Sequence, residues 1–475
     1  MSSPIQPMIP ARSPSSVARC LAAALLGLAA LAPALAQESA GATAFVHVNV
    51  VPMDGDSPRV LQDETVVIEH GLVAAIGHAL APPPGARIID GRGRLFLSPG
   101  LADMHTHAES SGDMKLYLAY GVTSVLHMSG ASSDFMDQRR PLLNTGARPG
   151  PHVYAAFRID GTPEYGQFVV RTPDEARWVT RLAKTNGYDF IKVYNNLSPE
   201  CFEATLDEAR RQGMAVVGHG LTRVGLERQL ALGQKLVAHA EEFLYTTFAS
   251  ATSDDPDAPP DWAQVPPAIA FIKRSGAFVT ADLATYDHIA RQWGRPHVLE
   301  RWLKAPEIAW LSPGQRLAWR KEDYVTRSGS LDARDAFLHR FAHALQDAGV
   351  PLVAGTDAPS VPGMVPGESL HEDLRALGDA GFTPYEALST ATRNAGRFIH
   401  DTVPGAIPFG EVAAGFRADL VLTDANPIDD LATLRAPLGV MSHGVWYDKA
   451  RLDQLLAGVT KDYRDAAAPV AGRTD

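Results

Sequence analysis

The sequence predicts an α/β protein: a (β/α)8 barrel of the TIM type with a small β-domain built from both chain ends. Between residues 98 and 398, eight short apolar strands alternate with amphipathic helical stretches. Segments of β type occupy 43–97 and return after 418. With 475 residues, 45% of them apolar, the chain can bury a core of this size without disulfide bonds.

The first 36 residues have the pattern of a secretory signal peptide. Arg12 and Arg19 precede the apolar run LAAALLGLAALAPALA, and Ala34-Leu35-Ala36 provides a small-residue cleavage site. The run is too short and too rich in alanine for a membrane span. We therefore expect a periplasmic or secreted protein, free of the membrane once residues 1–36 are removed. Cys20 would leave with them, so the remaining Cys201 could form no internal disulfide.

Residues 37–97 and 399–475 are assigned to the two halves of the β-domain. Runs such as AFVHVNVV and ETVVIEHG end in Gly, Asp or Pro, which is typical of short antiparallel strands. The runs ADLVLTD and APLGVMSHGVWYD show the same pattern near the other end of the chain. Two β-rich ends around a different middle predict a single β-domain, although the pairing of its strands cannot be derived from the sequence.

Residues 98–398 are assigned to the barrel. Helices are expected over 173–186, 200–212 and 336–348, the last two leading into Gly213 and Gly349. An open doubly wound sheet is the alternative, but no Gly-rich phosphate loop follows any of the strands. The eight strands are the segment before Asp103, followed by VTSVLHM, HVYAAFRID, FIKVYNN, AVVGHG, KLVAHAEEF, AFVTADL and PLVAGTDAP.

Two connections are longer than a minimal barrel requires. Residues 246–267 are polar and rich in proline, and about 70 residues separate the seventh strand from the eighth. The longer insert holds Trp293, Trp302, Trp310 and Trp319. Both connections follow strand C-termini, the face on which barrel enzymes carry their sites. A lid with an aromatic wall is one interpretation, and tryptophans that only fill the packing between insert and barrel are the other.

Metal-ligating residues stand at the ends of several predicted strands. In Asp103-Met104-His105-Thr106-His107, residues two apart in a strand face the same side, so His105 and His107 would supply the first pair of ligands to a Zn-type ion. The C-terminal ends of barrel strands converge on one small volume. Four further residues share this strand-end position: Lys192, His219, His239 and Asp357.

The charge distribution excludes some classes of partner. The net charge is −11 and no basic run occurs anywhere in the chain. This argues against nucleic acid or an anionic membrane surface and favours a small-molecule ligand. The oligomeric state is left open, with a homo-oligomer as one option.

The strand-end motifs, taken together, resemble those of the amidohydrolase superfamily. SPGLADMHTH, then Lys192, His219, His239 and Gly355-Thr356-Asp357 follow in the order of that family, with matching flanks ARIIDGRGRLFL and AGFRADLVLTDANP. The chain is most similar to the imidazolonepropionase-like and prolidase-like members. The resemblance implies a distorted (β/α)8 barrel with a β-sandwich made from both chain ends.

The resemblance also implies a site for two divalent metal ions, most commonly zinc. His105, His107 and Asp357 would hold the buried ion, and His219 and His239 the second. Lys192 would bridge the two ions as an N6-carboxylated lysine, because a carbamate supplies an anion where an ammonium would be repelled. A water between the ions would be the nucleophile, with Asp357 accepting its proton.

Five residues are candidates for contact with the substrate, each with a structural alternative. Leu126-His127 stands where many relatives carry an Arg-Asp pair after the second strand. His127 could contact the tetrahedral oxyanion or a substrate carboxylate, or be a hydrogen-bonded structural histidine. Arg158 and Arg223 could each bind a substrate carboxylate or form a surface ion pair. Tyr194 and Tyr245 are possible hydroxyl donors or core residues. Glu241 and Glu242 are candidates for orienting a ligand imidazole.

Four functions are compatible with these residues to different degrees. The leading one is an exported, metal-dependent hydrolase of an amide or peptide bond, acting on a dipeptide or an N-acyl or aryl-acyl amino acid by metal-activated hydroxide. An esterase, lactonase or phosphotriesterase would use the same ligands. A heterocycle deaminase is disfavoured by Lys192, which superfamily deaminases usually lack. A non-catalytic binding protein is disfavoured because no ligand is missing.

Overall fold

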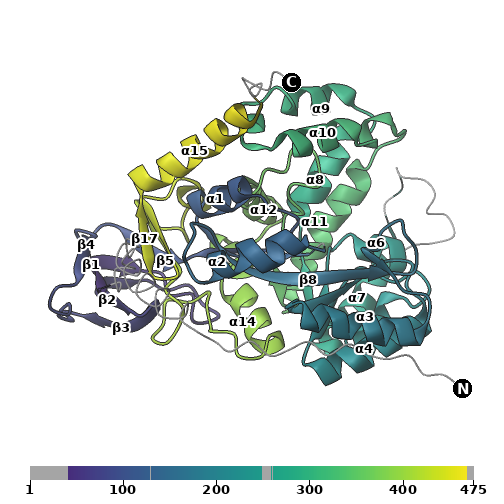
Figure 1. Ribbon diagram of the computed structural model, residues 1–475, viewed down its shortest axis with the longest axis horizontal. Helices are drawn as coiled ribbons and strands as arrows, with labels where there is room; N and C mark the ends of the chain where they lie inside the picture. Colours follow the sequence, from purple (N-terminus) through teal and green to yellow (C-terminus); the bar gives the residue numbers. More distant parts are fainter. Residues whose placement is uncertain (1–40, 129, 249–257, 259, 468–475) are drawn as a thin grey trace, which may run out of the picture. The chain divides into compact units, whose positions relative to one another are not determined.

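The computed structural model describes residues 41–128, 130–248, 258 and 260–467 (Figure 1). The expected signal peptide and residues 468–475 lie outside these ranges, as do residues 249–257 and 259 of the connection after the sixth barrel strand. Within the described residues, no helix has the length and apolar character needed to cross a membrane.

Eight parallel strands form the barrel, which confirms the predicted fold. Neighbouring strands pair in chain order, and main-chain hydrogen bonds close the ring between the first and last: Met104 N to Ala354 O (2.9 Å) and Thr356 N to His105 O (3.1 Å). The barrel strands are β6 (Leu101–Thr106), β7 (Val122–His127), β8 (His152–Asp160), β10 (Phe190–Val193), β11 (Ala215–Gly218), β12 (Leu236–Val237), β13 (Phe278–Thr280) and β14 (Leu352–Val353). A short extra strand, β9 (Phe168–Val169), pairs with β8.

Both chain ends contribute to a separate sheet. Its strands are β1 (Thr43–Val50), β2 (Leu61–Glu69), β3 (Leu72–His78), β4 (Arg87–Asp90), β5 (Phe96–Pro99), β15 (Leu420–Thr423), β16 (Gly439–Ser442) and β17 (Val445–Asp448). The N-terminal and C-terminal halves join where β5 pairs antiparallel with β15. Phe45, Leu97, Leu420 and Trp446 belong to one buried cluster, so strands from both ends share a core.

Local signals in the sequence set the helix ends. Thr172 and Glu175 form a capping box at the start of α3, and Ser198 caps α4. Gly213 ends α4 in the left-handed conformation (φ 64°), which glycine adopts without strain. The helices from α1 to α7 are α1 (Ser111–Ala119), α2 (Arg140–Asn144), α3 (Pro173–Thr185), α4 (Pro199–Gln212), α5 (Leu226–Leu232), α6 (Glu242–Thr246) and α7 (Val265–Ser275).

The long insert between β13 and β14 is helical. It contains α8 (Leu283–Gln292), α9 (Pro296–Trp302), α10 (Pro313–Lys321) and the 3-10 turn η4 (Tyr324–Thr326), before α11 (Asp332–Asp347) leads into the last barrel strand. Trp319 is its most deeply buried tryptophan, and its ring N–H donates to the carbonyl of Pro359 (2.8 Å). The remaining helices are α12 (Glu368–Asp379), α13 (Pro384–Thr390), α14 (Arg393–Thr402) and α15 (Lys449–Ala467); α15 packs against α1 (Figure 1).

Candidate metal centre and its cavity

The six predicted metal ligands gather at the C-terminal end of the barrel. His105 lies in β6 and Lys192 in β10, and His107 and His219 directly follow strands. His239 and Asp357 lie two and four residues after the ends of β12 and β14. All six have buried or largely buried side chains; His105 is fully buried and Lys192 is 1% exposed. The convergence of parallel strand ends thus brings together residues that are up to 252 positions apart.

His105, His107 and Asp357 form the first ligand group. One potential ligand atom from each lies within 4.8 Å of the others. The Nε2 atom of His107 is 2.6 Å from Oδ1 of Asp357, and Nε2 of His105 is 3.6 Å from the same oxygen. That buried oxygen nevertheless makes no contact with hydrogen-bond geometry in the described chain. Three donor atoms that face one point without hydrogen-bonding one another fit a divalent cation.

His219 and His239 form the second group, and carboxylates orient both. Nδ1 of His219 is 2.5 Å from Oε1 of Glu242, and Nδ1 of His239 is 2.5 Å from Oδ2 of Asp282. A carboxylate on Nδ1 holds the proton there and leaves the Nε2 lone pair for a metal. Although burial opposes it, Asp282 raises the pKa of His239 to about 9.

Lys192 lies against the first group and near the ring of Tyr194, which stacks on His219 of the second group. Its Nζ is 3.2 Å from Nε2 of His105, and its side chain points to the same face as Arg158, its register partner on β8. Burial lowers the pKa of Lys192 to about 7, despite the opposing charge of Asp357. A large fraction of the amine is therefore neutral near pH 7, and the neutral amine is the form that reacts with CO2 to give a carbamate.

The backbone around the site is held in unusual conformations. Asp282 and Asp357 both adopt left-handed backbone angles, with φ of 53° and 50°. Such angles cost energy for a residue other than glycine and concentrate at functional sites. Gly355 allows the last strand to approach the first closely, because a Cβ there would lie 2.8 Å from Cβ of His105. The ligand positions therefore depend on main-chain geometry as well as on the side chains.

Asp103, the first residue of the Asp-Met-His-Thr-His motif, is buried away from the ligand groups. It accepts hydrogen bonds from Oγ1 of Thr356 (2.6 Å) and from the backbone N–H of His105 (3.2 Å). Burial raises the pKa of its carboxyl to about 8. Asp103 therefore ties the first barrel strand to the segment after the last one and supports the ligands on both.

A cavity of about 420 Å³ opens beside the first ligand group. Three of the five predicted substrate-contact residues line it: His127, Arg158 and Tyr194. Arg223 is exposed and Tyr245 is 46% exposed, and neither lines this cavity. The complete lining is His107, Glu109, His127, Gly130, Arg158, Tyr194, Glu322, Tyr324, Asp357, Ser360 and Val361.

The insert reaches the cavity through residues that no sequence motif indicates. Glu322 and Tyr324, which follow α10, line the cavity, whereas none of the four insert tryptophans does. The interpretation that the insert tryptophans form an aromatic wall is therefore wrong for this cavity. The alternative, that they fill the packing, holds for the buried Trp319. Asp282 is a further functional residue that is not among the sequence candidates. It lies two residues after the end of β13, and its place near the end of the expected strand AFVTADL is the signal that indicates it.

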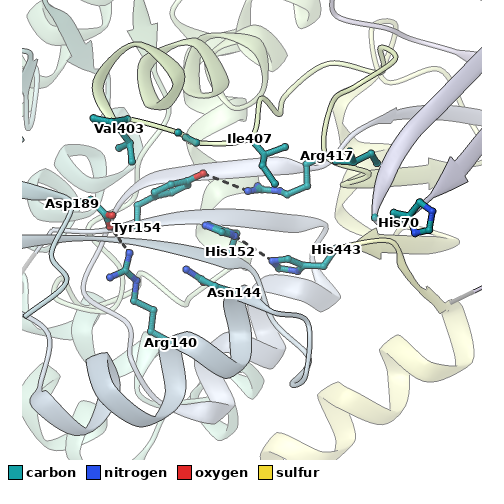
Figure 2. Close-up of a pocket in the computed structure, with 15 residues that line it drawn as sticks. His70, Arg140, Asn144, His152, Tyr154, Asp189, Val403, Ile407, Arg417 and His443 are labelled. Atoms are coloured by element: carbon teal, nitrogen blue, oxygen red, sulfur yellow. Dashed lines mark hydrogen bonds and ion pairs between the residues drawn. The ribbon is translucent and has the colours of Figure 1, made fainter. Parts of the chain in front are cut away.

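A second cavity, of about 390 Å³, lies near the N-terminal ends of β8 and β10 (Figure 2). Its charged and polar side chains pair with one another: Arg140 with Asp189 (2.5 Å), His152 with His443 (3.3 Å), and Arg417 with the hydroxyl of Tyr154 (3.4 Å). None of the predicted site residues lines this cavity. Because these side chains pair with one another, the cavity is interpreted as part of the structural contact between the barrel and the sheet formed by the chain ends.

Comparison with known proteins agrees with this architecture. The model of the family described as "Amidohydrolase family" matches residues 96–447. Ochratoxinase from Aspergillus niger is 22% identical over 462 residues, which cover 82% of this chain and 83% of that enzyme. A dihydroorotase from Geobacter sulfurreducens is 40% identical over 178 residues, 37% of this chain and 38% of that enzyme.

Solved structures share the fold at low sequence identity. Bottromycin amidohydrolase superposes with a TM-score of 0.69 at 24% identity, covering 89% of this chain and 90% of that protein. A putative prolidase from Bifidobacterium longum superposes with a TM-score of 0.63 at 22% identity, covering 88% and 99%. Both comparisons support the barrel with its additional sheet.

Proposed function

Because the chain belongs to the amidohydrolase family, we propose that it is an exported binuclear metal hydrolase that cleaves the amide or peptide bond of a dipeptide or an N-acyl amino acid. One observation carries the proposal. His107 and Asp357, which belong to the cluster of histidines around the buried Lys192, also line the cavity that contains Arg158. Ochratoxinase, prolidase and bottromycin amidohydrolase are relatives whose names fit this class.

The residues present fit two divalent ions, for which we propose zinc. His105, His107 and Asp357 would hold one ion, His219 and His239 the other, and Lys192, carboxylated on its amine, would bridge them. When bound, such ions lower the pKa of water and polarise a carbonyl group. Mixed imidazole and carboxylate donors are typical of zinc sites.

Asp357 is placed to move the proton in this reaction. Its Oδ1 lies at the first ligand group and its carboxylate borders the cavity. Burial opposes ionisation, but His107 and His239 hold the pKa of Asp357 well below its usual range. The carboxylate is therefore ionised when substrate arrives and can accept a proton, which it then transfers to the leaving amine.

Arg158 is the proposed partner of the substrate carboxylate. Its Nε is buried and has no hydrogen-bond partner in the described chain, and its guanidinium carbon lies 5.8 Å from the centre of the Tyr194 ring. Tyr194 in turn stacks on His219, with ring centres 3.8 Å apart. A guanidinium with free donors beside the second ligand group would orient a C-terminal amino acid through a bidentate contact.

The proposal is tested with purified, zinc-loaded protein and four substrate classes. Dipeptides, N-acyl amino acids, aryl esters and a phosphotriester are compared by kcat/KM, with Asp357→Asn as the control for contaminating hydrolases. We expect the highest kcat/KM on the dipeptides or N-acyl amino acids. A higher value for the aryl esters or the phosphotriester would replace the amide assignment with the corresponding ester hydrolase.

A further inference from the structure

The cavity beside the ligand groups is lined by charges of both signs, which come from different elements of the fold. Arg158 extends from β8, next to Tyr194 and the second ligand group. Glu109, Glu322 and Asp357 supply the carboxylates. A cavity lined by both a guanidinium and carboxylates is suited to a ligand that carries both a carboxylate and an ammonium group.

Two of the three carboxylates are already engaged. Asp357 belongs to the first ligand group, and Oε2 of Glu109 accepts hydrogen bonds from the backbone N–H and the hydroxyl of Ser132, both at 3.0 Å. The side-chain carboxylate of Glu322 has no hydrogen-bond or ion-pair partner among the described residues. It is therefore the cavity carboxylate that remains available to a ligand.

Neighbouring contacts fix the position of Glu322. Trp319, one turn earlier on α10, is anchored to the carbonyl of Pro359, two residues after the ligand Asp357. Two residues later, the carbonyl of Tyr324 accepts the backbone N–H of Gly294 (3.0 Å). The chain leaves the helix at Glu322 in an extended conformation (φ −63°, ψ 137°). Glu322 is thus held at the cavity by anchors on both sides.

The electrostatic surroundings of Glu322 favour a cationic partner. The side chain is half-buried, and burial, with the nearby charges of Asp323 and Asp357, raises its pKa. An approaching ammonium relieves both costs, because it replaces lost hydration and offsets the repulsion between the carboxylates. A neutral acyl group would leave the carboxylate without a partner inside the cavity.

We infer that Glu322 binds a primary ammonium group on the acyl side of the scissile bond, so that unblocked dipeptides rather than N-acyl amino acids are the substrate class. This inference rests on the proposed function. Glu322 would act with Arg158 as a pair that recognises the two charged ends of a zwitterion. The inferred ammonium is the N-terminal amine of the dipeptide. The test below distinguishes it from a side-chain amine, which would leave the site in place but overturn the choice of unblocked dipeptides.

The test measures binding, so that it does not depend on turnover. The probes are phosphinic dipeptide analogues, in which a phosphinate replaces the scissile amide. They are the Ala-Phe analogue with a free amine, the same analogue with an N-acetyl group, and the N-acetyl Lys-Phe analogue. Each is titrated calorimetrically into zinc-loaded protein. We expect the free amine to bind about tenfold more tightly than its acetylated form, as one charge-assisted hydrogen bond allows. Glu322→Gln should abolish this preference and leave the Kd of the acetylated Ala-Phe probe unchanged.

Asp323→Asn is the matched control. Asp323 is the adjacent carboxylate, is 59% exposed, pairs with Arg327 and does not line the cavity. Its loss should therefore lower the preference far less than Glu322→Gln does, because only a neighbouring, solvent-screened charge is removed. Preference for the N-acetyl Lys-Phe probe over N-acetyl Ala-Phe, lost in Glu322→Gln, would assign the side-chain amine. Equal affinities of wild-type protein for all three probes, or equal weakening of all three by Glu322→Gln, would overturn the inference.

Failure of the proposed function would appear differently. If the zinc-loaded protein hydrolyses esters but no peptides while the Glu322-dependent preference persists, the reaction class is wrong and the ammonium site stands. If it hydrolyses N-acyl amino acids as well as dipeptides, and Glu322→Gln lowers kcat/KM equally for both, the reaction class stands and the ammonium site is wrong.

Discussion

Lys192 and Asp357 are expected to fail in different ways when they are replaced. Lys192→Ala removes the bridging position, so metal content should fall below two ions per chain and activity should fall with it. Asp357→Asn keeps an oxygen but loses the proton acceptor, so kcat should fall about 10²–10⁴-fold with KM little changed. Metal analysis and steady-state kinetics on both variants measure this. A near-normal kcat in metal-loaded Asp357→Asn would contradict the proton-transfer role.

Asp282 is a positioning residue whose effect should appear in metal affinity. Its carboxylate holds Nδ1 of His239 at 2.5 Å and also accepts the hydroxyl of Thr285. We expect Asp282→Asn to weaken the second metal about 10–100-fold, because the imidazole loses its orienting anion. Competition with a chelator gives the dissociation constant of each metal ion. The constant of the ion held by His105, His107 and Asp357 should be unchanged. Equal weakening of both ions would show general disruption instead.

At the scale of elements, α10 depends on one tryptophan. Trp319 is 2% exposed and its ring N–H donates to the carbonyl of Pro359. Trp319→Phe should lower the free energy of unfolding by about 1–3 kcal/mol, since the carbonyl loses its donor and the smaller ring leaves space. Chemical denaturation measures the change. Trp178→Phe, at a residue that is 57% exposed, should change stability by less than about 0.5 kcal/mol.

At the scale of the whole molecule, Arg417 joins the sheet from the chain ends to the barrel. Its guanidinium contacts Asp419, Tyr154 and Ser124, and it is 5% exposed. Arg417→Met should lower the free energy of unfolding by about 3–5 kcal/mol, because it leaves the charge of Asp419 buried without a partner. The double variant Arg417→Met/Asp419→Leu should recover part of the loss. If the double variant is no more stable than Arg417→Met, then lost packing, and not the unpaired charge of Asp419, accounts for the lower free energy of unfolding.

The proposed export also belongs to the scale of the whole chain. The charged, apolar and small-residue pattern of residues 1–36 predicts cleavage after Ala36. Protein recovered from the periplasm or the medium should therefore begin at Gln37 by N-terminal sequencing. A chain that accumulates in the cytoplasm and still begins at Met1 would refute the prediction.

The sequence by itself determined the eight barrel strands, the β-rich ends and the strand-end position of all six proposed ligands. It could do so because strand periodicity is local and because parallel strand ends must meet at one edge of a barrel. Glu242 was also within its reach, since it follows His239 closely along the chain.

Only the tertiary structure decided which of the remaining candidates face the cavity. Arg158 and Arg223 are equivalent in the sequence, yet the register between β8 and β10 directs Arg158 to the side of Lys192, while Arg223 lies exposed after its strand. Glu322 reaches the cavity because the nearby Trp319 is anchored to Pro359, which lies in a distant segment of the chain. Such contacts depend on how an insert packs, and no local pattern encodes packing between segments distant in sequence.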